Sequence, residues 1–284
     1  MRVVFEINKG GKEEDVIVPS PELINSHNEV DAPENNWGYA IATAFLVAVM
    51  VIPPLSSFID SLPPTQYLQT LVSTSVLNNR SDNLANRIVK AMQRKGYQLS
   101  TNPSEVNIIY LRGADQYGNS NGNRINEWSD RRLVLMFRNG QPTVVGNWAA
   151  TVKPGLPAIQ NPTNNQGAAF IEPGQYSAWR VGTHHGIFGR VELGLVQVAP
   201  VKFRRDAIRL GDVSDQPVQS GMIGLNQHSG SDQQYVNKAS YACLAAQSQN
   251  AHLNKFMKLV MSDPRYRRDK NFVLTTTILD VSDI

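Results

Sequence analysis

The chain has 284 residues, of which 41% are hydrophobic and 18% are charged, and its formal net charge is +3. This composition excludes a wholly disordered chain, because there is enough apolar surface to build a core, and it excludes a polytopic membrane protein. The charge is small and no basic stripe is interleaved with aromatic residues, so we expect no nucleic-acid partner. The single cysteine excludes an internal disulfide and a cysteine-based zinc cluster, and we expect neither a metal nor a cofactor.

The first sixty residues divide into a polar tail and an apolar segment. Residues 1–36 are acidic and contain three prolines, which indicates an extended tail with one short strand at 3–7. Residues 37–59 carry no charge and are apolar on every side, so we expect a helix there. If that helix continues through Pro53-Pro54, it is long enough to anchor the chain in a membrane. The alternative is a helix buried against a protein partner or a core.

Residues 60–99 read as a linker that contains one amphipathic helix. Ser81 or Asp82 is suited to cap the helix, and Gly96 stands where a helix ends in left-handed backbone. The apolar stripe consists of Leu84, Ile88, Ala91 and Met92. Its spacing places these side chains on one face, which predicts that this face packs against the rest of the protein.

From residue 100 onward the pattern changes to short β-type runs separated by turn residues. Strands are predicted at 106–111, 133–137, 143–145 and 191–198, and Asn139-Gly140 is typical of a tight hairpin turn. A helix at 251–262 and a strand at 272–279 close the chain. We therefore expect residues 100–284 to form a mainly β domain with a few α-helices, of the α+β class.

Two short segments carry the residues best suited to catalysis. They are Gly224-Leu-Asn-Gln-His228-Ser-Gly230 and Ser240-Tyr-Ala-Cys243. An imidazole beside a thiol lowers the thiol pKa and moves its proton, and backbone N–H groups near the cysteine can form an oxyanion hole. The alternative is that Cys243, in the sequence Ala-Cys-Leu-Ala-Ala, only packs in the core.

The order and spacing of these segments resemble the catalytic segment of the L,D-transpeptidase (YkuD-type) family. In that family a His-Gly motif precedes a Ser-x-Gly-Cys motif on a β-sandwich-like or barrel-like fold. Residues 96–279 also resemble a poorly characterised group of bacterial and phage proteins. The further motifs of that group occur here at 107–113, 149–155, 173–176, 179–184, 195–197, 205–206 and 252–257.

The resemblance implies a cell-envelope protein that acts on the peptides of peptidoglycan, as a transpeptidase or as a peptidase. Cys243 would attack a peptide carbonyl at a meso-diamino acid, with His228 as its base and Ser240 as a third catalytic residue. The residues expected to bind the substrate are Asn226, Gly230, Tyr241, Arg205 and His184. With 37–59 as an anchor, the protein would be membrane-anchored and would face the cell envelope.

The sequence departs from the family pattern on both sides of the cysteine. Ala242 replaces the usual glycine, and its methyl group would crowd the site if this position needs left-handed backbone. Ala245 stands where the family usually has an arginine, so a contact to the substrate carboxylate is missing. These departures favour the alternative function, a non-catalytic structural or interaction protein of an envelope or phage assembly that keeps the fold.

Overall fold

A computed structural model describes residues 83–186, 189–230 and 232–284. All of them belong to the second of two compact units, Thr65–Ile284. The predicted acidic tail at 1–36, the strand at 3–7 and the apolar segment at 37–59 lie outside the described residues. None of the helices in the described part of the chain has the length and apolar character that are needed to cross a bilayer.

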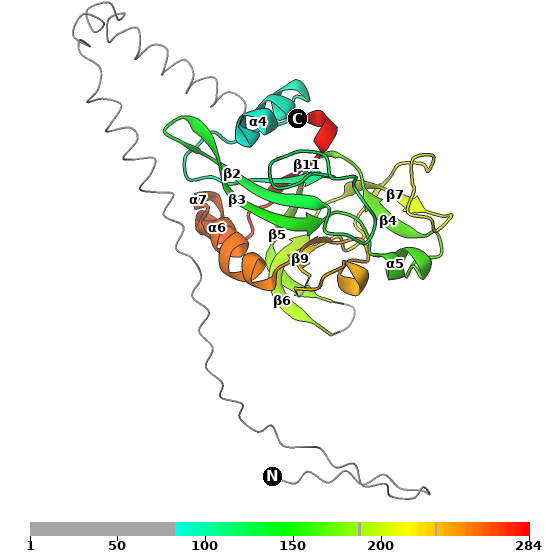
Figure 1. Cartoon of the computed structure of the whole chain (residues 1–284). Coiled ribbons are helices and arrows are strands. Elements are labelled where there is room, and N and C mark those ends of the chain that lie inside the picture. The colour runs from blue at the N-terminus through cyan, green and yellow to red at the C-terminus, as the bar shows by residue number, and fades with distance from the viewer. Residues whose placement is uncertain (1–82, 187–188, 231) are drawn as a thin grey trace, which may run out of the picture. The chain divides into compact units, whose positions relative to one another are not determined.

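In the described residues, eight strands close into a mixed barrel (Figure 1). In order around the barrel they are β1 (Asn107–Arg112), β11 (Leu274–Asp280), β5 (Gly174–His185), β6 (Val191–Gln197), β9 (Gln227–Ser229), β10 (Leu244–Ala246), β3 (Gln141–Thr151) and β2 (Asp130–Arg138). The β1–β11 and β9–β10 pairs are parallel, whereas the other neighbours are antiparallel. The mainly β, α+β class predicted from the sequence is confirmed.

A tight turn connects β2 to β3, as predicted. Asn139 and Gly140 both have left-handed backbone, with φ of 50° and 71°. Two such residues in succession make the turn whose twist matches that of the flanking strands, and asparagine followed by glycine adopts it at low cost. Arg138 pairs with Gln141 directly across the turn, so this dipeptide sets the register of the longest hairpin of the barrel.

Helix α4 (Leu84–Arg94) packs on the outside of the barrel and belongs to the same compact unit. Its cap is neither Ser81 nor Asp82: Asn83 Oδ1 accepts a hydrogen bond of 2.9 Å from the Asn86 N–H. Gly96 follows the helix with a φ of 68°, as predicted. The predicted stripe is largely buried, and the helix packs against Ile109, Leu111, Leu133 and Leu135 of β1 and β2.

The predicted helix at 251–262 closes the core on another side of the barrel. It begins as a π-helix, η2 (Ala251–Phe256), and continues as α6 (Met257–Ser262), followed by α7 (Pro264–Arg268). Phe256, Met257 and Val260 are fully buried in the main core. Trp179 lies in the same core, and its indole N–H donates to the carbonyl of Leu225 at 2.7 Å. This bond holds the segment that leads into β9.

A second, three-stranded sheet flanks the barrel. It consists of β4 (Ala168–Ile171), β7 (Val201–Asp206) and β8 (Gln219–Gly221), in that order, and the short helix α5 (Leu156–Gln160) lies near it (Figure 1). The 3-10 helices η1 (Asn237–Ala239) and η3 (Val281–Asp283) complete the described elements. Strand β4 of this sheet contributes residues to the lining of the cavity described below.

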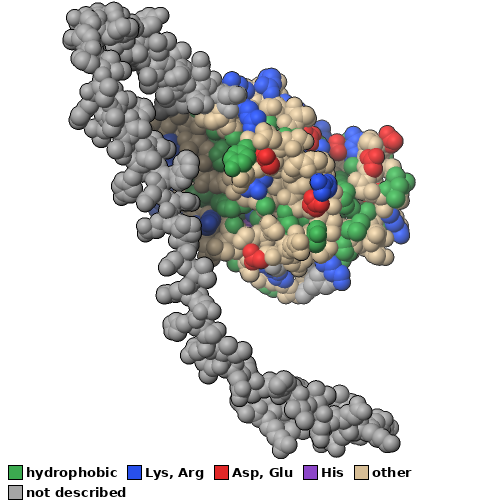
Figure 2. Space-filling view, viewed as in Figure 1, with side chains coloured by type: hydrophobic (Ala, Val, Ile, Leu, Met, Phe, Trp, Pro, Cys, Tyr) green, Lys and Arg blue, Asp and Glu red, His purple; other side chains and the backbone are tan. Residues whose placement is uncertain are grey.

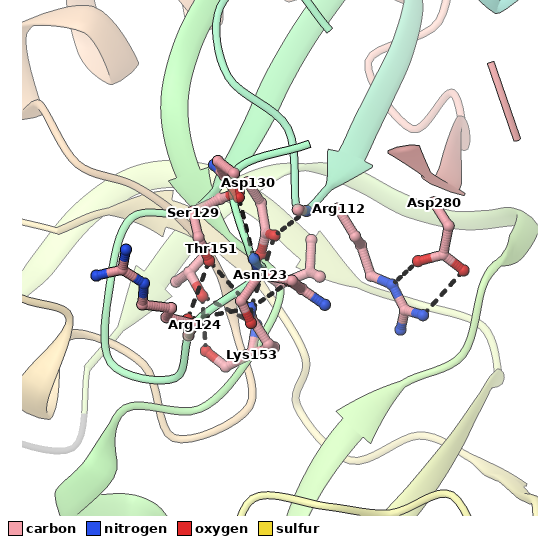
Figure 3. A network of polar contacts seen from close by, with 11 residues as sticks. Arg112, Asn123, Arg124, Ser129, Asp130, Thr151, Lys153 and Asp280 are labelled. Carbon is pink, nitrogen blue, oxygen red and sulfur yellow. Dashed lines mark hydrogen bonds and ion pairs between the residues drawn. The ribbon is translucent and has the colours of Figure 1, made fainter. Parts of the chain in front are cut away.

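Two buried residues, Lys153 and Asp130, bind the long connection between β1 and β2 through hydrogen bonds (Figure 3). Asp130 accepts hydrogen bonds from the N–H groups of Gly113 (2.9 Å) and Val152 (2.8 Å). The Lys153 ammonium donates to the carbonyl of Asn123 at 2.8 Å and lies 3.9 Å from the Asp130 carboxylate. Burial raises the pKa of Asp130 and lowers the pKa of Lys153, because both charged forms are removed from water.

Charges of both signs are interspersed on the face of the protein seen in Figure 2. Several lysine and arginine side chains lie at the upper end of this face, and aspartate and glutamate side chains lie near other basic ones, with hydrophobic side chains between them. Steering of a polyanion depends on a continuous basic patch. Among the described residues on this face, the basic side chains are separated by acidic and hydrophobic ones in several places.

We predict that a methyl group at Gly155 disrupts the segment that precedes Cys243. The Gly155 N–H donates to the Ser240 carbonyl at 2.9 Å, and a Cβ here would lie 1.9 Å from the Asn237 carbonyl oxygen. Gly155→Ala should therefore lower the free energy of unfolding by about 1–3 kcal/mol. Gly221→Ala is the matched control, because its Cβ would approach nothing closer than 3.8 Å. Urea unfolding of both variants tests this, and equal midpoints would contradict it.

Candidate active site

A cavity of about 740 Å³ opens where the barrel wall meets the small sheet. Six of the eight residues predicted for the site line it: His184, Arg205, Asn226, His228, Tyr241 and Cys243. They come from β5, β7, β9 with the residue before it, and the segment before β10. The fold therefore brings most of the predicted site together.

The pairing of β9 with β10 brings the cysteine and the histidine to one cavity. Ala245 pairs with His228, and the Leu244 N–H donates to the Asn226 carbonyl at 2.9 Å. Cys243 directly precedes this pairing. Because the two strands are parallel, their equivalent ends lie side by side, and His228 and Cys243 both line the same cavity.

Cys243 is partly exposed where it lines the cavity. Its Sγ donates to the carbonyl of Gly224 at 3.6 Å. Burial raises the pKa of the Cys243 thiol to about 11, although the Asn226 backbone N–H, which favours the thiolate, lowers it slightly. The expectation that the neighbouring imidazole lowers this pKa is wrong for the resting state, because desolvation of the sulfur outweighs its polar contacts.

His228 is oriented as a neutral base. Its Nδ1 lies 2.8 Å from the carbonyl oxygen of Ser229, which can only accept, so Nδ1 carries the proton and Nε2 keeps its lone pair. Burial, followed by the repulsion of His184, lowers the pKa of His228 to about 3. The imidazole is therefore neutral near pH 7 and able to receive a proton on Nε2.

His184 lies flat against His228. The two rings are parallel, with an interplanar angle of 1° and centroids 4.1 Å apart. Asn226 fixes the tautomer of His184: its amide oxygen accepts from the Gln197 N–H at 2.9 Å, so its NH₂ donates to His184 Nδ1 at 3.1 Å. Burial lowers the pKa of His184 as well. The neutral His184 therefore carries its proton on Nε2.

Glu192, which was not predicted from the sequence, supports His228 from β6. Its carboxylate accepts from the Ser229 N–H at 2.9 Å and from the Ser229 hydroxyl at 3.0 Å, and it lies 3.7 Å from His228 Nδ1. Arg190 donates to the same carboxylate at 3.0 Å. A buried carboxylate beside the protonated nitrogen holds the imidazole in one orientation and compensates a positive charge that forms on it. The alternation of apolar and polar residues along β6 did not indicate that Glu192 faces His228.

Ser240 and Gly230 do not line the cavity. The Ser240 hydroxyl is buried and donates to the Cys243 carbonyl at 2.8 Å, so it positions the cysteine backbone. A Cβ at Gly230 would lie 2.1 Å from the Trp128 ring, which makes this glycine a packing requirement. Ala242 lines the cavity and is not among the residues with positive φ, so its methyl group causes no backbone strain.

The described residues that line the cavity include cations but no aspartate or glutamate. Arg205, Arg190 and Lys238 contribute the permanent positive charges. Arg205 lies over the Phe203 ring at 5.2 Å and donates to the Gly167 carbonyl at 2.9 Å, which orients its guanidinium. Arg190 is already paired with the Glu192 carboxylate, whereas the planar guanidinium of Arg205 has a geometry that suits a carboxylate.

In the described residues, no group of three histidine, cysteine or acidic side chains is arranged to hold a metal ion. A scan against models of protein families, a search of curated proteins and a search of solved structures each found no match to this chain.

We predict that His228 makes the protein sensitive to mild acid. Its pKa of about 3 lies below the value of about 6.5 in an unfolded chain, so between these pH values the unfolded state binds more protons. Stability is therefore lost as the pH falls from 6.5 towards 3, at up to about 1.4 kcal/mol per pH unit for this group.

Replacing His228 with glutamine should remove this contribution. Between pH 7 and 4.5, the free energy of unfolding of His228→Gln should fall by about 2–3 kcal/mol less than that of the wild type. His185→Gln, at an exposed neighbouring histidine, is the control. Urea titrations at both pH values measure the difference, and an unchanged loss in His228→Gln would contradict the burial argument.

Proposed function

We propose that this protein is a cysteine acyltransferase or peptidase that acts on carboxylate-bearing peptides of the peptidoglycan type. The observation that carries the proposal is the shared cavity: Cys243 and His228 line it together, and His228 has Nδ1 tied to a carbonyl and Nε2 available as a base. The resemblance to L,D-transpeptidases supplies the substrate class.

The first half of the reaction forms a thioester. As the sulfur of Cys243 attacks the peptide carbonyl, its proton passes to Nε2 of His228 and the C=O bond becomes an oxyanion. Collapse of this intermediate breaks the C–N bond, and the proton on His228 goes to the departing amine. With a thiol pKa of about 11, proton transfer accompanies attack, and no thiolate is stored beforehand.

Two backbone groups next to the nucleophile are suited to hold the oxyanion. The N–H groups of Ala242 and Cys243 donate to no other described residue, and both residues line the cavity. Such donors stabilise charge that develops only in the transition state. This arrangement supports the oxyanion hole expected from the sequence.

In the second half an acceptor takes the acyl group. An amine gives a new peptide bond and a cross-link, whereas water gives hydrolysis. In both cases His228 removes a proton from the acceptor, the C–S bond breaks, and the proton returns to the sulfur of Cys243. The cationic lining holds a substrate carboxylate, with Arg205 in place of the family arginine that is missing at Ala245.

The cell envelope is the place we propose for this activity. Residues 37–59 would anchor the chain in the membrane or bind a protein partner there, and the domain after residue 83 would reach the peptidoglycan peptides. This proposal rests on the apolar character of the segment, which lies outside the described residues.

A second candidate function is binding without catalysis, in an envelope or phage assembly. The observation that favours it is the resting state of Cys243, whose thiol donates to Gly224 and has a raised pKa. In this case the cavity would hold the same anionic peptides, and the thiol would remain unmodified.

The formation of a covalent adduct distinguishes the two functions. We predict that the full chain, incubated with a peptidoglycan tetrapeptide stem containing a meso-diamino acid, gains the mass of an acyl group on Cys243. Intact mass spectrometry measures the adduct. Its rate should fall at least about a hundredfold in His228→Gln, because general-base catalysis contributes roughly that factor.

The control places a thiol elsewhere. Cys243→Ser should give no thioester, and adding Ser104→Cys to it should not restore one, because residue 104 is exposed and outside the cavity. A wild-type chain that binds the peptide but never forms the adduct would overturn the catalytic proposal in favour of binding.

A further inference from the structure

A wholly buried arginine lies behind the barrel wall that carries the candidate site. Arg132 is on β2, has no exposed surface and points into the barrel with Tyr110, its partner on β1. We propose that Arg132 is a positioning residue, which ties β9 to β10 from inside the barrel and so holds His228 and Cys243 in register. This inference rests on the proposed function, because it concerns the same two residues.

One nitrogen of the guanidinium contacts both strands. Arg132 Nη2 donates to the His228 carbonyl at 3.1 Å and to the Leu244 carbonyl at 3.0 Å. His228 is the proposed base, and Leu244 directly follows Cys243, the proposed nucleophile. The strands have three residues each, so their own ladder is short. Arg132, which does not line the cavity, adds a link across that ladder.

The guanidinium is itself held by its neighbours. Its Nε donates to the Tyr110 hydroxyl at 2.5 Å, and its Nη1 donates to His252 Nδ1 at 2.8 Å. His252 Nε2 in turn donates to the Leu193 carbonyl at 2.9 Å, and the guanidinium lies 4.4 Å from the centre of the Phe256 ring. These contacts restrict the movement of the guanidinium. A positioning residue must itself be held in place.

Packing alone does not explain why a charged side chain is buried at Arg132. No carboxylate in the described part of the chain lies within ion-pair distance of Arg132. Burying such a charge is costly, and an apolar side chain of similar volume often serves stability equally well. What the guanidinium supplies, and an apolar side chain does not, is a planar set of donors for several acceptors at once.

The charge of Arg132 also acts on His228. The titratable and charged groups around this imidazole are Arg132 on β2, His184 on β5, Arg190 and Glu192 at β6, Cys243 before β10 and His252 on η2. Arg132, His184 and Arg190 disfavour a proton on His228, and Glu192 opposes them. Arg132 therefore helps to keep His228 in its neutral form, in the orientation that the strands define.

Two substitutions distinguish the effect of the hydrogen bonds that Arg132 makes to β9 and β10 from the effect of its positive charge. Arg132→Lys keeps the charge but cannot span the same acceptors, whereas Arg132→Met removes both. Met92→Ala is the matched control, because it opens the core under α4 without contacting the site. The probe for the full chain is p-nitrophenyl acetate, whose carbonyl forms a bond to Cys243 sulfur as p-nitrophenolate leaves and the thiol proton passes to His228.

We expect Arg132→Lys to acylate about ten- to a hundredfold more slowly than the wild type, because a small displacement of reacting groups has an effect of that size. The pKa of His228, measured by NMR, should stay near its wild-type value in Arg132→Lys and rise in Arg132→Met. Amide hydrogen exchange should accelerate in β9 and β10 in both variants. Met92→Ala should lower the melting temperature and leave acylation and its pH profile unchanged.

The inference is overturned if Arg132→Lys acylates at the wild-type rate with the wild-type pH profile, or if Met92→Ala slows acylation equally. If Arg132→Met does not fold, Arg132→Lys decides alone. If the wild type is not acylated at all, the proposed function fails. Arg132 is then judged by hydrogen exchange: faster exchange confined to β9 and β10 supports the link, and unchanged exchange refutes it.

Discussion

The candidate site depends on how two strands of three residues each, β9 and β10, are held. His228, the proposed base, lies on β9, and Cys243, the proposed nucleophile, directly precedes β10. Parallel pairs of this length have too few ladder hydrogen bonds to be stable alone. Closure of the barrel places β6 and β3 on their outer edges. Trp179 holds the chain before β9, and Arg132 links the two strands from within. A short parallel pair is thereby made rigid enough to define a geometry.

Burial determines the protonation states at this site more than any single charge does. The thiol of Cys243 and the imidazoles of His228 and His184 all have pKa values shifted towards the neutral form. In the proposed reaction, a neutral pair at rest would mean that charge develops only when a substrate carbonyl is attacked. Glu192 and the backbone N–H groups beside Cys243 are suited to compensate that charge, and Arg205 is suited to a substrate carboxylate.

The sequence was informative wherever the signal was local. Asn139-Gly140 predicted its turn because left-handed backbone favours those residues, and the stripe of α4 followed from helical periodicity. Strand β5 was not predicted, because its glycines and two histidines interrupt any alternation of apolar residues. The small sheet was missed for a related reason: β4 is apolar on every residue and β7 ends in charged residues.

The sequence by itself predicted the mainly β class, because periodicity is visible without a fold, and it singled out His228 and Cys243, which the structure places in the lining of one cavity. Only the tertiary structure decided which groups surround them. Arg132 lies 96 positions from His228, and Glu192 lies 37 positions from Ser229. The structure also decided the raised pKa of the Cys243 thiol, since desolvation depends on how many atoms pack around a sulfur. Local sequence has no access to that quantity.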